Sequence, residues 1–179
     1  NAARTNQQSA AIAIGNSAGQ GSQGTNAIAI GVGSGSSNQR SGSIAIGYFA
    51  GFQDQSGNAI AIGVQAGQTS QATVAIAIGY QAGFSAQGTN GIAIGALAGY
   101  SGQASGAIGI GQQAGYNGQA VNAIGLGNLA GQNGQRTGAV GIGFQAGATT
   151  QGTNAIAIGA TAGQNSQQSG AIAIGYQSG

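Results

Sequence analysis

The chain has 179 residues, including 39 glycines, and it contains no proline, cysteine, methionine, tryptophan or histidine. Charged residues make up 2% of the sequence, against the ~25% of an ordinary soluble domain. Arg4, Arg40, Arg136 and Asp54 give a net charge of +2, and three separated arginines form no basic patch for nucleic acid. A lone carboxylate without histidine or cysteine predicts no enzyme activity, cofactor or metal site. No apolar run approaches the ~18 residues that cross a bilayer, so no membrane insertion is expected.

A 16-residue repeat begins at Ala11 and keeps its phase without insertion or deletion. Ten full units cover 11–170, and partial units cover 1–10 and 171–179, so the sequence predicts a single repeat domain over 1–179. The fifth and ninth positions of each unit are always glycine, as in Gly79 and Gly83. The thirteenth position is always glutamine, as in Gln87.

Each unit predicts one coil of four segments, illustrated by residues 75–90. Ala75–Ile78 alternates with period two, which is typical of a strand, and regular glycines disfavour a helix. Gly79–Gly83 predicts a tight corner, positions 10–14 a second and more polar strand, and Gly88–Asn90 a turn. The expected fold is therefore all-β: a parallel β-solenoid or β-roll of 16-residue coils with two short strands per coil. Stacking at ~4.8 Å per coil would give a rod about 50 Å long.

The first strand of each coil has two apolar faces, one of isoleucine and one of alanine, glycine or serine. A strand with a wet face should carry polar residues there, so we expect both faces to be buried, one of them against other copies of the chain. The simplest such assembly is a homotrimer; a monomer with a mildly apolar surface is the alternative. Which face lines the interior stays open. The proposed oligomer or core stripe comprises Ile12, Ile14, Ile28, Ile30, Ile44, Ile46, Ile60, Ile62, Ile76 and Ile78 and their later equivalents.

The recurring glutamine predicts a polar ladder. Side-chain amides one coil apart can hydrogen-bond along the axis and also bind backbone groups of the corner. A ladder that binds sugar or ice is the alternative. Its members are Gln23, Gln39, Gln55, Gln71, Gln87, Gln103, Gln119, Gln135, Gln151 and Gln167.

All nine aromatic residues fall at positions 6, 7 or 10, around the predicted corner. They either pack along the rim of the roll or present a strip that binds a glycan or protein on a host surface. The candidate ligand-facing residues are Tyr48, Phe52, Tyr80, Phe84, Tyr100 and Tyr116.

The motif S-I-A-I-G at 43–47, and A-I-A-I-G in other units, resembles the head repeats of trimeric autotransporter adhesins. The longer pattern is also similar to repeats of phage and giant-virus fibre proteins and other surface filaments. This resemblance implies a β-roll that trimerises, with Ile12, Ile14 and their equivalents in the interior or at the trimer contact, and a place outside the cell, on a cell surface or on a virion. The 16-residue period is longer than that of the adhesin repeat.

These features favour a structural fibre or adhesin shaft without catalysis. Open coil ends would also let chains stack head to tail into a filament. The first alternative is a receptor- or glycan-binding adhesin head or viral fibre. A second is an ice-binding protein, which the lack of a repeated T-x-T array disfavours.

Overall fold

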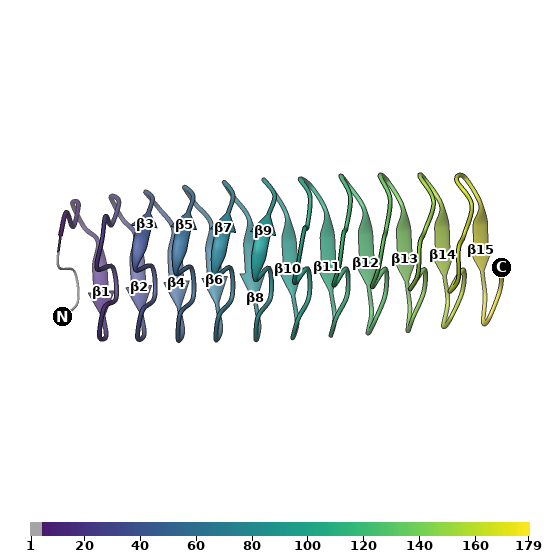
Figure 1. Cartoon of the computed structure of the whole chain (residues 1–179), viewed down its shortest axis with the longest axis horizontal. Coiled ribbons are helices and arrows are strands. Elements are labelled where there is room, and N and C mark those ends of the chain that lie inside the picture. Colours follow the sequence, from purple (N-terminus) through teal and green to yellow (C-terminus); the bar gives the residue numbers. More distant parts are fainter. Residues whose placement is uncertain (1–4) are drawn as a thin grey trace.

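The computed structural model describes residues 5–179 and forms a rod of stacked coils with its two ends far apart (Figure 1). Residues 1–4 of the predicted domain lie outside the described residues. The parallel β-solenoid with coils of 16 residues is confirmed: every strand pairs with its equivalent one coil away, as Ile76 pairs with Ile92. The coils therefore lie in register along the whole described chain.

One side of the rod is a continuous parallel sheet of 11 strands, one from each successive A-I-A-I segment. Each strand has three residues, and alternating β-branched residues suit this pleated surface. In sheet order they are β1 (Ile12–Ile14), β2 (Ile28–Ile30), β4 (Ile44–Ile46), β6 (Ile60–Ile62), β8 (Ile76–Ile78), β10 (Ile92–Ile94), β11 (Ile108–Ile110), β12 (Ile124–Leu126), β13 (Val140–Ile142), β14 (Ile156–Ile158) and β15 (Ile172–Ile174).

The second sheet is shorter than the sequence predicts. Instead of one strand in every coil, the described residues contain four: β3 (Ser37–Gln39), β5 (Gln53–Gln55), β7 (Thr69–Gln71) and β9 (Ser85–Gln87). Isolated parallel bridges continue beyond them, from Ser85 to Ser101 and on to Thr149. The residue at position 12 has a positive φ both in coils with a second strand and in coils without one, +49° at Asp54 and +67° at Gly118, so this conformation alone does not decide where a strand forms. The prediction of two strands per coil is therefore wrong for most coils.

Two features require glycine at position 5: the backbone conformation of the residue and the close approach of the next coil. Its φ lies between +118° and +132° in every coil, a conformation that side chains strongly disfavour. A Cβ added to Gly79 would lie 2.7 Å from the carbonyl oxygen of Gly95 in the next coil. Coils can stack this closely at the corner only when the residue has no side chain. At the far turn, Asn26 and Asn58 adopt the left-handed conformation expected of turn asparagines, with φ of +59° and +58°.

The interior of the rod is narrow and is lined by small residues. Alanines at positions 1, 3 and 8, such as Ala59, Ala61 and Ala66, are fully buried, whereas the isoleucines of the same strands point outward. The largest fully buried side chains are glutamine and then serine. The isoleucine stripe was predicted to lie either in the interior or at an oligomer contact. Because these side chains point outward, the interior location is wrong. The space between the strand and the opposite side of the coil admits alanine but no branched aliphatic side chain.

Candidate interaction surfaces

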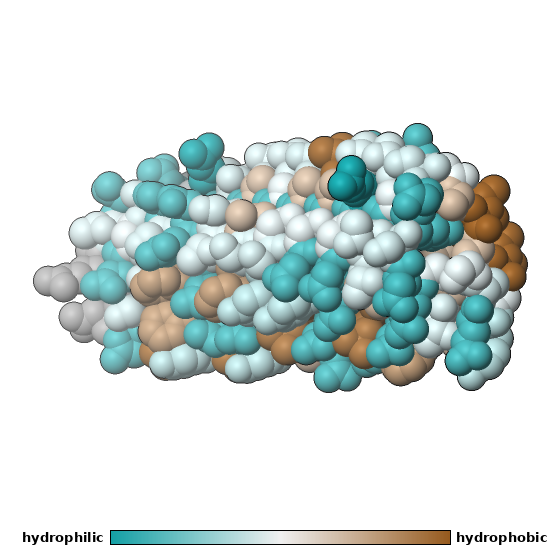
Figure 2. Space-filling model, turned by 45° about the vertical axis from the view of Figure 1, so that its right-hand side comes forward, coloured by the Kyte–Doolittle hydropathy of each residue, from teal (hydrophilic) through white to brown (hydrophobic). Residues whose placement is uncertain are grey.

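The outward face of the 11-stranded sheet is entirely aliphatic. Positions 2 and 4 are isoleucine in every strand except for Leu126 and Val140. Most of these side chains are half-buried by their neighbours in the middle of the rod, although Ile110 is 38% exposed there, and Ile174 is 65% exposed at the end. Figure 2 shows apolar residues gathered at the C-terminal end, where these last strands lie. We call this surface the isoleucine face.

The predicted glutamine ladder exists and lies inside the rod. Nε2 of Gln71 donates to the carbonyl oxygen of Ile60 at 2.7 Å, to that of Ala75 at 3.2 Å, and to Oε1 of Gln87 at 3.2 Å. The same amide-to-amide bond recurs in each coil from Gln39 to Gln167. One backbone acceptor is in the first strand of the same coil and the other immediately precedes the first strand of the next coil, so neither belongs to the corner as predicted. The ladder therefore ties the two sides of the rod together and stacks the coils.

The glutamine at position 13 and the glycine at position 9 require each other. A Cβ added to Gly83 would lie 2.7 Å from Oε1 of Gln87, so the amide oxygen rests against the glycine Cα. Gly83 also has a φ of +52°. The amide-to-amide bonds begin at Gln39, which donates to Gln55. Oε1 of Gln23 and Oε1 of Gln39 are buried without a hydrogen-bond partner, so Gln23 does not donate to Gln39. Buried in this way, the ladder offers no surface to sugar or ice.

Five of the six candidate ligand-facing aromatic residues divide into two groups. Tyr48 and Tyr80, at position 6, are 51% and 53% exposed. Phe84, Tyr100 and Tyr116, at position 10, are half-buried and stack on one another in consecutive coils. Their ring faces are turned toward each other, so they offer little surface on which a sugar could stack.

Phe52 belongs to neither group. Its ring packs edge to face against Phe49, with ring centroids 4.9 Å apart. The Phe49 ring lies close to Gly33 of the preceding coil, where a Cβ would meet it at 2.6 Å. The Tyr48 ring also packs edge to face against Phe49, with centroids 4.4 Å apart, so these three rings form a local cluster at the corner. The 16-residue spacing of residues 84, 100 and 116 is the sequence signal that distinguishes the continuous stack from this cluster.

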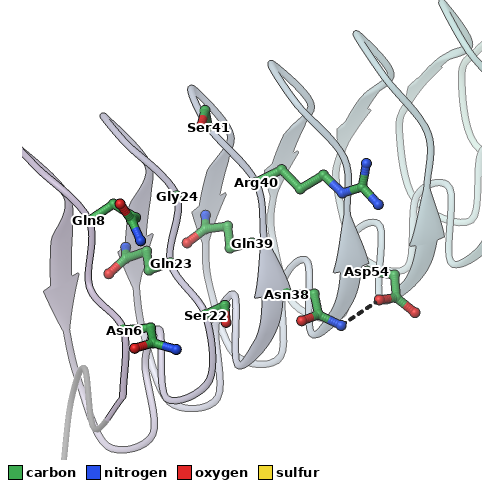
Figure 3. Close-up of a pocket in the computed structure, with 10 residues that line it drawn as sticks. All are labelled: Asn6, Gln8, Ser22, Gln23, Gly24, Asn38, Gln39, Arg40, Ser41 and Asp54. Carbon is green, nitrogen blue, oxygen red and sulfur yellow. Dashed lines mark hydrogen bonds between the residues drawn. The ribbon is translucent and has the colours of Figure 1, made fainter.

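A polar hollow near the N-terminal end was not anticipated from the sequence (Figure 3). Its lining includes Arg40, Ser41 and Asp54, and the Asp54 carboxylate accepts a hydrogen bond of 3.0 Å from Nδ2 of Asn38. Figure 3 shows Arg40 extending along the rod axis across neighbouring coils. The hollow is shallow and has one carboxylate, so its described residues supply no acid–base pair.

Comparison of the chain with protein-family models, curated proteins and solved structures finds no match. Within residues 5–179, no cluster of three or more histidine, cysteine, aspartate or glutamate residues could hold a metal ion. The same residues form no helix that is long and apolar enough to cross a membrane. The surfaces of the rod are therefore the features from which a function can be argued.

Proposed function

We propose that the chain is a structural rod that associates with copies of itself through the isoleucine face, most simply as a homotrimer, and that it serves as a fibre or adhesin shaft. The observation that carries the proposal is the unbroken aliphatic outer face of the 11-stranded sheet. The resemblance of the sequence repeat to adhesin and viral fibre repeats supports a location of the chain on a cell or virion surface.

The size of this face favours association. Eleven strands at about 4.8 Å make it about 50 Å long, and two rows of side chains give it an area on the order of 500 Å². A patch of that size is near the upper end of what monomers leave exposed. Removing it from water would contribute on the order of 10 kcal/mol per chain before the entropic cost of association.

The charge of the chain favours association as well. A net charge of +2 on 179 residues gives copies little electrostatic reason to stay apart. Isoleucine side chains of neighbouring chains would interdigitate around a symmetry axis parallel to the rod. Each chain would then bury both faces of its large sheet, one in its own coil and one against its partners.

Charge substitution on the face tests the proposal. The double variant Ile76→Lys/Ile92→Lys places two outward lysines in neighbouring strands and should dissociate the assembly to monomers in sedimentation velocity. Thr89→Lys/Thr137→Lys is the matched control, because both threonines are exposed on turns and the added charge is equal. Equal oligomeric states for the two double variants, with unchanged circular dichroism, would contradict the proposal.

A second candidate, binding of a glycan or protein receptor, is favoured by the exposure of Tyr48 and Tyr80. Tyrosine exposed on a rigid rod is suited to recognition because it loses little conformational entropy on binding. Tyr48→Ala/Tyr80→Ala should abolish binding to cells or to glycan arrays and leave self-association intact. Unchanged binding by this variant would exclude the role of these residues.

A further inference from the structure

Tyr100 and Tyr116 are the one pair of tyrosine rings that stack among the described residues. Their centroids are 5.0 Å apart and their planes differ by 10°. Both residues are at position 10 of consecutive coils, so the in-register solenoid holds the two phenols side by side. Each side chain is half-buried, which restricts its motion and leaves part of the ring open to solvent.

Two stacked phenols held in register are positioned for oxidative coupling. We propose that Tyr100 and Tyr116 form a modification site, at which a one-electron oxidant joins them as dityrosine and so links two consecutive coils covalently. The co-reactant is of the class of a haem peroxidase with hydrogen peroxide. The site lies on the corner and is separate from the isoleucine face, so the proposal is independent of self-association.

The reaction balances with one hydrogen peroxide. Each phenol loses one electron and one proton and becomes a phenoxyl radical, and the peroxide is reduced to two waters. The radicals combine through a new carbon–carbon bond between their ortho carbons. The two ortho hydrogens then move to the oxygens and restore both phenols. The product has lost two hydrogen atoms relative to the starting chain.

The neighbours of the pair limit coupling to this one place. Phe84 stacks on Tyr100 with the same 5.0 Å centroid distance but has no phenol oxygen, so it cannot form the radical. The other tyrosines, Tyr48, Tyr80 and Tyr176, occupy position 6 of coils that are not adjacent, and none of them stacks on another tyrosine. A link within one chain should therefore involve Tyr100 and Tyr116 alone.

The location also gives the link a structural consequence. β9 is the last strand of the second sheet, and the stack runs from Phe84, beside β9, to Tyr116, two coils beyond it. A covalent bond at Tyr100 and Tyr116 would join the first two coils after that sheet ends. Oxidation would thus reinforce the rod where one side of its backbone pairing becomes irregular.

Treatment of the dilute full chain with horseradish peroxidase and hydrogen peroxide tests the proposal. We expect dityrosine fluorescence in material that migrates as a single chain on denaturing gels and has lost two hydrogen atoms by mass. Tyr116→Phe should lose this product, while Tyr80→Phe should retain it. Phe84→Tyr should add a second coupling partner for Tyr100 and increase the yield.

Free tyrosine, treated in parallel, shows that the oxidant is active. The proposal is overturned if wild-type chain gives no dityrosine while free tyrosine does, or if the product is found only between chains. It is also overturned if Tyr116→Phe, with unchanged circular dichroism, keeps the intrachain product. Loss of the product in Phe84→Tyr would contradict the stacked geometry.

Discussion

The coils of β2, β4, β6, β8 and β10 and those of β11, β12 and β13 share one sheet but differ on the opposite side. In the first region position 3 is alanine, as in Ala77, and every coil except that of β10 carries a strand of the second sheet. In the second region position 3 is glycine in three consecutive coils, at Gly109, Gly125 and Gly141, and no second strand forms. The large sheet therefore defines the rod, and the other side adapts to local sequence.

Backbone hydrogen bonds show what changes between the two regions. In the first, the amide of Gln39, at position 13, donates to the carbonyl of Ser22, at position 12 of the preceding coil. In the second, the amide of Gly118, at position 12, donates to Ser101, at position 11. This second pattern begins at Gly102, in the coil of Ala93, and continues at Ser166, in the coil of Ala157, so it extends beyond the coils with glycine at position 3 on both sides. Glycine at position 3 therefore does not by itself set the pairing of a coil.

The largest expected effect is common to both regions. Gly79→Ala and Gly111→Ala add a Cβ that meets the next coil's carbonyl oxygen at 2.7 Å and 2.5 Å, at φ of +129° and +127°. Each should destabilise the rod by about 3 kcal/mol or more, since backbone strain and a backbone clash combine. Chemical denaturation measures the loss. If only one of Gly79→Ala and Gly111→Ala lowered the stability, the two regions would not share the large sheet in the same way.

An intermediate effect should separate the two regions. Gly109 pairs with Ala93 of the preceding coil, and a Cβ on Gly109 would lie 2.7 Å from the carbonyl oxygen of Ala114. Gly109→Ala should therefore destabilise by about 1–3 kcal/mol through overpacking. The reverse change, Ala93→Gly, should cost about 1 kcal/mol through lost packing and added backbone freedom. If both variants have the denaturation midpoint of the wild-type chain, the interiors of the two regions do not differ at position 3.

The smallest effect concerns position 12. Ala86 has a φ of +54°, and Ala86→Gly should stabilise the rod by about 1 kcal/mol, because glycine relieves the left-handed strain. Nothing lies within 4 Å of a Cβ added to Gly118, whose φ is +67°, so Gly118→Ala should cost about the same amount through strain alone. Shifts of the same sign in thermal melts of the two variants would refute this account.

The repeat predicted much of the fold because its glycines report directly on backbone geometry. Gly79 and Gly83 marked a corner that does require positive φ, and the Gln87 ladder follows from one glutamine per coil. The second strand was overestimated because a period-two pattern does not reveal that the backbone pairing of position 12 changes from Gly102 onward, although position 12 is left-handed both at Ser70, within β7, and at Gly118, where no strand forms. The strand pattern alone therefore could not give the length of the second sheet.

The orientation of the first strand was left open because isoleucine and alanine are both apolar. The volume of the interior decides it: Gly83 and Ala82 on one side and Gln87 on the other leave room only for alanine at Ala77. The invariant glycine and glutamine were visible in the sequence. Their direct contact, which narrows the coil, was not.

Native mass spectrometry of the wild-type chain tests most directly the claim that the isoleucine face binds other copies. With a subunit mass of 16.9 kDa, we expect a discrete oligomer, most simply of three subunits, at micromolar concentration. A stable species of 16.9 kDa as the dominant form under these conditions would contradict the account, because the aliphatic face of the 11-stranded sheet would then remain in water.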